Sequence, residues 1–479
     1  MTLSREAIVD GLREILDPEQ VVTDEQVLRE RSIDNFRKLE NIFGTYTLPP
    51  PAAVAMARST QDVANVLAFA DENGINVVPR TGGTATEGGL ETVVPDSIVV
   101  DGSGMSRILS IDPYDMQATC ECGVPLQELE DRARELGLTT GHSPQSKPVA
   151  HMGGLVATRS IGQFSTLYGG IEDMVVGLEA VFPGGEVTRI KNVPRRAAGP
   201  DIRHVIIGNE GALCYITEVT VKLFPYLPEN NAFLGWTLGS MTTGFEALRE
   251  VMVAGYKPSV ARLYDPEDGG LHFSHFARPD ECVLLFMAEG AAGIAKATAE
   301  GIAEIVARHP ECSPVDGELI REWFEDLTWG PDKIEAEDER IRTTRNVNRT
   351  TEVSAGWSSI NDIYEAAVAR IRAEIPGITL LGGHSSHSYI NGTNMYFNYF
   401  YDLGDVPPAE EAPRIYLPII SIICEETLKR GGSIVHHHGI GKARAPWARD
   451  EHGSSYSILE TLKRAFDPNG VMNRGAIIP

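Results

Sequence analysis

The sequence is short of basic residues and of long apolar runs. Its 42 lysines and arginines stand against 67 acidic residues, which gives a net charge of −25. Nucleic acids and anionic membranes are bound by basic patches, so this balance argues against both as partners. No apolar run approaches the length of a membrane-spanning helix, and acids stand where a signal peptide would be apolar. We therefore expect a cytoplasmic protein without a membrane span.

Paired cysteines and the common nucleotide-binding motifs are also missing. The six cysteines include no CxxC pair, and Cys120 and Cys122 alternate along a predicted strand without being bonded to each other. This usage is typical of a reduced protein. Neither GxGxxG nor GxxxxGK[ST] occurs, so the Rossmann and P-loop modes of nucleotide binding are not supported.

What the sequence does contain is a glycine-rich segment, residues 78–89, directly after a predicted strand at 75–78. Glycine permits positive φ and lets backbone N–H groups approach a ligand, while Arg80 and three threonines add donors and charge. This combination suits a pyrophosphate, although a surface turn explains the glycines alone equally well. Two further donor-rich segments, 141–162 and 201–218, are separated from the first by predicted strands. Three such segments in order indicate a shared ligand site much more specifically than one segment does.

Two histidine-bearing segments, 382–392 and 431–442, are the candidates for chemistry. The run His436-His437-His438 is poorly explained by packing, because each buried imidazole needs a hydrogen-bond partner. One interpretation is a metal site that includes His387 and His437. The other is acid–base catalysis, for which histidine near its ordinary pKa is suited, as is a tyrosine such as Tyr389.

These segments together resemble the vanillyl-alcohol-oxidase superfamily of flavoenzymes, and in detail the alkylglycerone-phosphate synthases and related bacterial FAD-linked oxidoreductases. The resemblance runs from about residue 46 to the C-terminus. It implies an α+β fold, with a two-subdomain FAD-binding domain of the p-cresol-methylhydroxylase type and an α+β cap domain of antiparallel sheet and flanking helices. The domains expected are 1–226 for FAD, 227–449 for the cap and substrate, and 450–479 for a C-terminal segment that returns to the flavin.

The resemblance also implies which residues contact FAD. They are Pro79, Arg80, Thr81, Gly82, Gly83, Thr84, Ala85, Gln145, Ser146, Lys147, Pro148, Val149, Ala150, His151, Thr158, Arg159, Ser160, Ile161, Glu210, Gly211, Ala212, Leu213, Cys214, Tyr215 and Ile216. Thr84 stands where some relatives carry a flavin-linking histidine, and no cysteine occurs between 141 and 154. Non-covalent FAD is therefore expected.

By the same resemblance, Tyr389 matches the catalytic tyrosine of the synthase and His436, His437 and His438 match its essential histidines. Arg262 and Arg342 would hold an anionic substrate together with His387, and Asn473 would support the flavin from the C-terminal tail. A buried arginine paired within the structure is the alternative for Arg262, and a solvated basic face is the alternative for Arg342.

Flavin-dependent 2-hydroxyacid dehydrogenases resemble the same stretches and hold a divalent metal. Here His387 matches their first ligand, Asn394 stands where the second histidine is expected, and His437 replaces a glutamate. These two departures favour acid–base catalysis over metal binding, so no metal is expected.

The function expected is FAD-dependent oxidation of a small polar, anionic, hydroxylated substrate such as a 2-hydroxy acid or sugar acid. The alternative is a synthase-type transferase that exchanges an acyl for an alkyl chain through a flavin N5 adduct. A non-enzymatic flavin-storing module is disfavoured by the intact tyrosine and histidine motifs. The electron acceptor is unknown, and a homodimer is expected from the resemblance alone.

Overall fold

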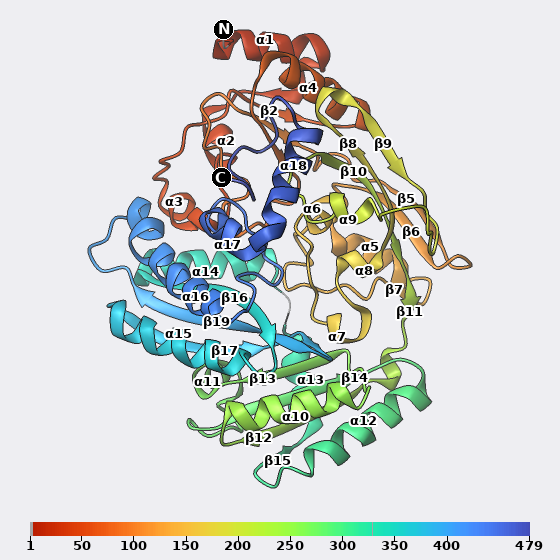
Figure 1. Cartoon of the computed structure of the whole chain (residues 1–479), viewed down its shortest axis with the longest axis vertical. Coiled ribbons are helices and arrows are strands. Elements are labelled where there is room, and N and C mark those ends of the chain that lie inside the picture. Colours follow the sequence, from red (N-terminus) through yellow and green to blue (C-terminus); the bar gives the residue numbers. More distant parts are fainter. Residues whose placement is uncertain (1–2, 328) are drawn as a thin grey trace.

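The computed structural model describes residues 3–327 and 329–479. In Figure 1 the N-terminal half, red to yellow, lies above a green to light-blue half, and the dark-blue C-terminal segment returns to the upper half. Helices and antiparallel sheets are mixed in both halves, which confirms the α+β class.

The upper half begins with a four-stranded sheet of order β1-β2-β4-β3, in which β2, β4 and β3 are parallel. Its strands are β1 (Val21–Val22), β2 (Ala53–Met56), β3 (Val77–Arg80) and β4 (Ile98–Asp101). The helices that pack against it are α1 (Arg5–Ile15) and α4 (Thr60–Asn73). Ser59 caps α4 by accepting from the Asp62 N–H, and Gly74 ends it with φ of 66°. The predicted strand and its glycine-rich segment therefore follow a well-defined helix.

A second, antiparallel sheet completes the upper half, in the order β5-β6-β10-β8-β9. Its strands are β5 (Ile108–Asp112), β6 (Gln117–Glu121), β8 (Val175–Val181), β9 (Val187–Ile190) and β10 (Tyr215–Lys222). The helices around it include α5 (Leu126–Arg134), α6 (Met152–Ala157), α8 (Ile171–Met174) and α9 (Arg203–Ile206). The two sheets are the two subdomains that the resemblance implied.

The lower half is built on one large antiparallel sheet, the cap sheet, of order β15-β12-β14-β13-β17-β19-β16, with β18 paired to β19. Its strands are β12 (Ala232–Leu238), β13 (Val260–Tyr264), β14 (Cys282–Ala288), β15 (Ser313–Val315), β16 (Asn346–Gly356), β17 (Ile378–Ser385), β18 (Ser388–Tyr389) and β19 (Gly392–Asp402). Its helices are α10 (Met241–Val253), α11 (Pro266–Phe273), α12 (Ala292–Val306), α13 (Gly317–Glu325), α14 (Pro331–Thr344), α15 (Ile360–Glu374) and α16 (Leu417–Lys429).

Side chains alternate across the cap sheet, and this alternation creates the site. On β19, Met395, Phe397 and Tyr399 join the core under the helices, whereas Tyr396 and Asn398 face the other way. Successive strand residues point to opposite faces, so one face of the sheet is apolar and the other offers polar groups toward the upper half.

Both termini reach the upper half. Met472, which follows α17 (Ala448–His452) and α18 (Tyr456–Phe466) in the chain, forms a parallel bridge with Val77 at the start of β3. The segment that contains α2 (Glu25–Glu30) and α3 (Lys38–Phe43) connects to the cap through the Lys38–Glu337 ion pair.

The domain boundaries at 226 and 449 stay predictions. Among the described residues, no helix combines the length and hydropathy needed to cross a membrane.

Candidate active site

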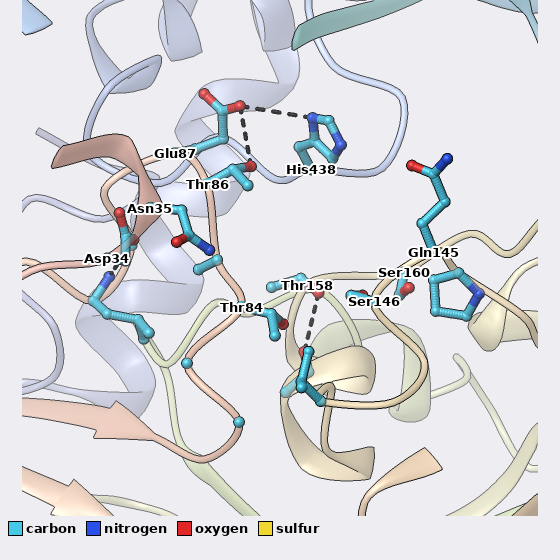
Figure 2. Close-up of a pocket in the computed structure, with 18 of the residues that line it drawn as sticks. Asp34, Asn35, Thr84, Thr86, Glu87, Gln145, Ser146, Thr158, Ser160 and His438 are labelled. Atoms are coloured by element: carbon cyan, nitrogen blue, oxygen red, sulfur yellow. Dashed lines mark hydrogen bonds and ion pairs between the residues drawn. The ribbon is translucent and has the colours of Figure 1, made fainter. Parts of the chain in front are cut away.

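A cavity of about 950 Å³ lies between the two halves, and all three donor-rich segments contribute to its wall. Figure 2 shows Thr84 of the first segment near Thr158 at the end of α6, with Gln145 and Ser146 beyond them. The predicted residues that line it are Pro79, Arg80, Thr81, Gly82, Gly83, Thr84, Ala85, Gln145, Ser146, Val149, His151, Thr158, Ser160, Ile161, Glu210, Gly211, Cys214, Tyr215 and Ile216. Lys147, Pro148, Ala150, Arg159, Ala212 and Leu213 do not line it.

The glycine-rich loop after β3 is suited to a pyrophosphate. Within the described chain, the N–H groups of residues 81–87 donate no hydrogen bond to other protein groups, so they are available to a ligand. A Cβ at Gly82 would lie 2.7 Å from the Val149 oxygen, and Gly83 has φ of 71°. Burial lowers the pKa of Arg80 to about 10, which still leaves it charged at neutral pH. The donors, the close approach and the charge all fit the diphosphate of a dinucleotide.

The histidine run is held by a buried carboxylate. Glu352 on β16 accepts the backbone N–H groups of His436, His437 and His438, at 2.5, 3.3 and 2.9 Å. Arg444, fully buried, donates to the Glu352 carbonyl oxygen and forms two bonds of 3.0 and 2.9 Å with the Glu87 carboxylate. Burial raises the pKa of Glu87 to about 7, although Arg444 acts in the opposite direction. The run is therefore tied to the glycine-rich loop.

Tyr389 reaches the cavity only through the histidines. Its hydroxyl lies 2.8 Å from His436 Nε2, His436 Nδ1 lies 2.8 Å from His437 Nδ1, and His437 Nε2 lies 2.5 Å from the Tyr396 hydroxyl. His437, His438 and Tyr396 line the cavity, whereas Tyr389 and His436 stand behind them. Burial lowers the pKa of His436 and of His437 to about 3, so both are neutral at ordinary pH.

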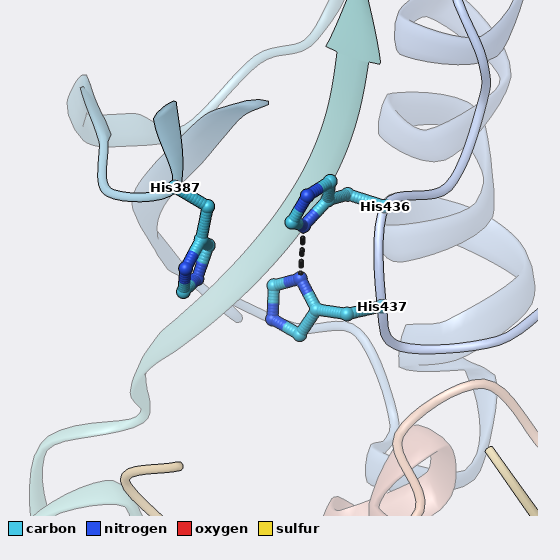
Figure 3. Close-up of side chains that lie close together, drawn as sticks. All are labelled: His387, His436 and His437. Carbon is cyan, nitrogen blue, oxygen red and sulfur yellow. Dashed lines mark hydrogen bonds between the residues drawn. The ribbon is translucent and has the colours of Figure 1, made fainter. Parts of the chain in front are cut away.

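His387, His436 and His437 lie close enough to be considered for a metal, with ligand atoms within 4.8 Å of one another (Figure 3). However, the rings of His387 and His436 are stacked at 18°, and His436 and His437 are hydrogen-bonded to each other. A metal would require that bond to break, and no carboxylate belongs to the group. The present arrangement fits hydrogen bonding better than metal ligation.

Arg262 on β13 lines the cavity and is 3% exposed. It donates to the Tyr264 hydroxyl at 2.6 Å and lies over the Trp323 ring, while its buried Nε has no partner. No acid among the described residues forms an ion pair with it. A buried guanidinium without an anion is costly, so this position is suited to an anionic ligand. The structure thus disfavours the internally paired alternative.

Arg342 is not brought to the site. It lies in the last turn of α14 with its side chain half exposed, forms an ion pair with Glu339, and does not line the cavity. The helix directs its side chain to the surface, so this geometry does not support the substrate role, which stays a prediction. Arg349, the fourth residue of β16, lines the cavity and is paired with Glu411.

Two sets of cavity residues were missed by the sequence interpretation. One is the N-terminal segment, from which Asp34, Asn35 and Lys38 line the cavity. The other is the polar face of the cap sheet, with His384, Tyr396 and Asn398. The period-2 pattern of residues 393–400 could have identified Tyr396 and Asn398, whereas nothing near residues 30–42 indicated a ligand.

Comparison with known proteins agrees with this geometry. A family model described as FAD binding domain matches residues 51–191, and one described as FAD linked oxidases, C-terminal domain, matches residues 227–477. An FAD-binding half and an oxidase-type half define a flavoenzyme.

The chain belongs to the FAD-linked oxidoreductases. It is 64% identical to the FAD-linked oxidoreductase YgcU of Escherichia coli (strain K12), with 100% of this chain and 99% of YgcU covered. It is 27% identical to alkyldihydroxyacetonephosphate synthase of Trypanosoma brucei brucei, the same synthase under its other name (99% and 81% covered). It is 24% identical to the mitochondrial D-lactate dehydrogenase [cytochrome] of Arabidopsis thaliana (98% and 80%).

The fold is also similar to that of the synthase. A solved structure of alkyldihydroxyacetonephosphate synthase superimposes with a TM-score of 0.78 at 21% identity, covering 98% of this chain and 85% of that one. The recognised family and the expected fold are thus confirmed, and the protein is an FAD-binding oxidoreductase.

Proposed function

We propose that this enzyme oxidises a small anionic, hydroxylated molecule of the 2-hydroxy-acid or sugar-acid class, with FAD bound non-covalently. The observation that carries the proposal is Arg262, a buried cation that lines the cavity and has no acidic partner among residues 3–327 and 329–479. The relative named D-lactate dehydrogenase is compatible with this substrate class.

In this proposal the glycine-rich loop holds the FAD diphosphate with its N–H groups and Arg80. His384, Tyr396 and Asn398 on the polar face of the cap sheet would line the part of the cavity that is left for the flavin ring. When bound, FAD supplies a two-electron oxidant that accepts hydride at N5. Thr84 in place of a linking histidine supports non-covalent binding.

The chain's own residues orient the substrate and take up a proton. Arg262 would bind the carboxylate, with His387 on the neighbouring wall. His437 and His438 would contact the ligand, while Tyr389 and His436 would act behind them through the hydrogen bonds described above. Asn473 donates to the carbonyl oxygens of Gly89 and Glu210, which supports the loop from the C-terminal tail.

A second candidate function is acyl-for-alkyl exchange of the synthase type. One wall of the cavity carries Ile42, Ile334 and Phe400, which could accept an alkyl chain. This apolar wall is the observation that favours the transferase.

One experiment separates the two. The FAD-loaded protein is mixed anaerobically with D-2-hydroxy acids and sugar acids, and the visible flavin absorbance is followed. Bleaching by a hydroxy acid supports oxidation. The transferase function would replace the oxidase function if no member of the panel bleached the flavin and if acyl-dihydroxyacetone phosphate and a fatty alcohol gave an ether product.

A further inference from the structure

His384 on β17 carries a feature that the proposed function leaves unused. Its Nδ1 lies 2.5 Å from Oδ2 of Asp268, which is completely buried at α11. The other oxygen of Asp268 accepts from Asn398 Nδ2 at 3.0 Å. A carboxylate fixed in this way holds the proton on Nδ1 and leaves Nε2 as the basic nitrogen.

The ring is also fixed in orientation. It is stacked between Tyr264, at a centroid distance of 4.8 Å and 25°, and Tyr396, at 4.7 Å and 23°. His384 lines the cavity, and within the described chain its Nε2 makes no hydrogen bond. Nε2 is therefore the ring nitrogen left for a ligand.

The surrounding charges support a proton-accepting role. Burial works to raise the pKa of Asp268, yet His384 and Asn398 bring that pKa below its usual value, so the carboxylate stays ionised beside the imidazole. In contrast, the nitrogens of His436 and His437 are engaged with each other and with Tyr389 and Tyr396. A base whose other nitrogen faces a carboxylate is better suited to proton removal than these neutral, mutually bonded rings.

We propose that Asp268 and His384 are the acid–base pair of the cavity, with His384 Nε2 taking the proton of the substrate hydroxyl and Asp268 positioning the ring. The inference rests on the proposed function. The O–H bond breaks and its proton forms a bond to Nε2; its electron pair forms the C=O bond as the carbon-bound hydrogen leaves as hydride to FAD, the oxidant. Arg262, on the adjacent strand β13, would hold the carboxylate of the same molecule.

Other charged or titratable groups face His384 from each neighbouring element. They are Asp268 and His272 from α11, Arg262 and Tyr264 from β13, His387 after β17, Tyr396 from β19 and His437 from the histidine run. Arg262 brings a positive charge to this part of the cavity, and Asp268 brings the negative charge that His384 Nδ1 contacts. Asp268 is the nearer group, at hydrogen-bond distance, so its removal has the larger effect.

Chemical rescue tests the pair. His384→Ala leaves a ring-sized space between two tyrosines, and we expect flavin reduction by the hydroxy acid that reduces the wild type to slow about 10²- to 10⁴-fold, with FAD still bound. Added imidazole should restore at least about tenfold of that loss. Asp268→Asn should give an intermediate rate that imidazole does not improve. His275→Ala, at an exposed histidine of the adjoining segment, is the matched control and should behave as wild type.

A measurement without turnover separates this inference from the proposed function. In protein labelled with ¹⁵N at the histidine rings, the N–H signal lost in His384→Ala identifies residue 384. Because a carboxylate accepts its Nδ1–H, that proton should resonate far downfield in the wild type and move upfield in Asp268→Asn. An unchanged N–H resonance in Asp268→Asn would overturn the pair. So would an undiminished rate in His384→Ala. If no hydroxy acid reduces the wild type, the proposed function fails, and the N–H resonance still decides whether the pair exists.

Discussion

Gly82→Ala should weaken the binding of FAD. The added methyl group would lie 2.7 Å from the Val149 oxygen and 2.9 Å from the His151 nitrogen, both backbone atoms. Ordinary contact needs at least 3.4 Å, so the glycine-rich loop and the segment before α6 must separate by about 0.7 Å. Overpacking of this kind costs about 1–3 kcal/mol, which corresponds to FAD binding weaker by about 5- to 150-fold.

The matched control is Gly239→Ala, which does not line the cavity. Its added methyl group would meet nothing within 4 Å, and its φ is not in the left-handed region. FAD affinity of the apoprotein, measured by quenching of flavin fluorescence, should fall in Gly82→Ala and stay near wild type in Gly239→Ala. Thermal unfolding of both apoproteins reports any general loss of stability. Equal FAD affinity in the two variants would refute the assignment of this loop to the cofactor.

Three further predictions concern the other walls of the cavity. Arg262→Met should raise the hydroxy-acid concentration needed for half-maximal flavin reduction about 30-fold or more, and Arg262→Lys should raise it less. Equal half-maximal concentrations for the two variants would exclude a direct contact between Arg262 and the anion. Tyr389→Phe should slow flavin reduction in stopped-flow experiments while leaving FAD bound; an unaltered rate would remove Tyr389 from the proton pathway. Burial raises the pKa of Glu210 from 4.5 to about 7, so between these values the folded protein keeps a proton that the unfolded chain loses. The stability that this group contributes therefore falls as the pH rises from 4.5 to about 7. Denaturant unfolding of Glu210→Gln should lack that decline, and an identical pH dependence in both proteins would contradict it.

Local sequence signals predicted much of the fold. Ser59 and Gly74 predicted the limits of α4, and Val63, Val66 and Leu67 are buried as its apolar stripe required. Leu136 is an exception: its spacing from Leu129 and Ala133 predicts the apolar face of a helix, yet α5 ends at Arg134 and Leu136 is exposed. Capping and periodicity act over a few residues, so they define such elements well except at their ends.

The parts of the site that depend on long-range contacts were less accessible. Arg342 and Arg349 lie in the same basic stretch, but only the position of α14 and β16 decides which one faces the cavity. Likewise, Asp268 and His384 are 116 residues apart, and the register of β17 beside β13 brings them together. A single sequence carries no local signal for that pairing.

The most direct test of the account is a crystal structure of the FAD-loaded protein. We predict the diphosphate on the N–H groups after β3 and the flavin ring facing the cap sheet, within reach of Arg262 and His384. A flavin ring directed away from these two side chains, or FAD bound outside the cavity, would contradict the proposed chemistry.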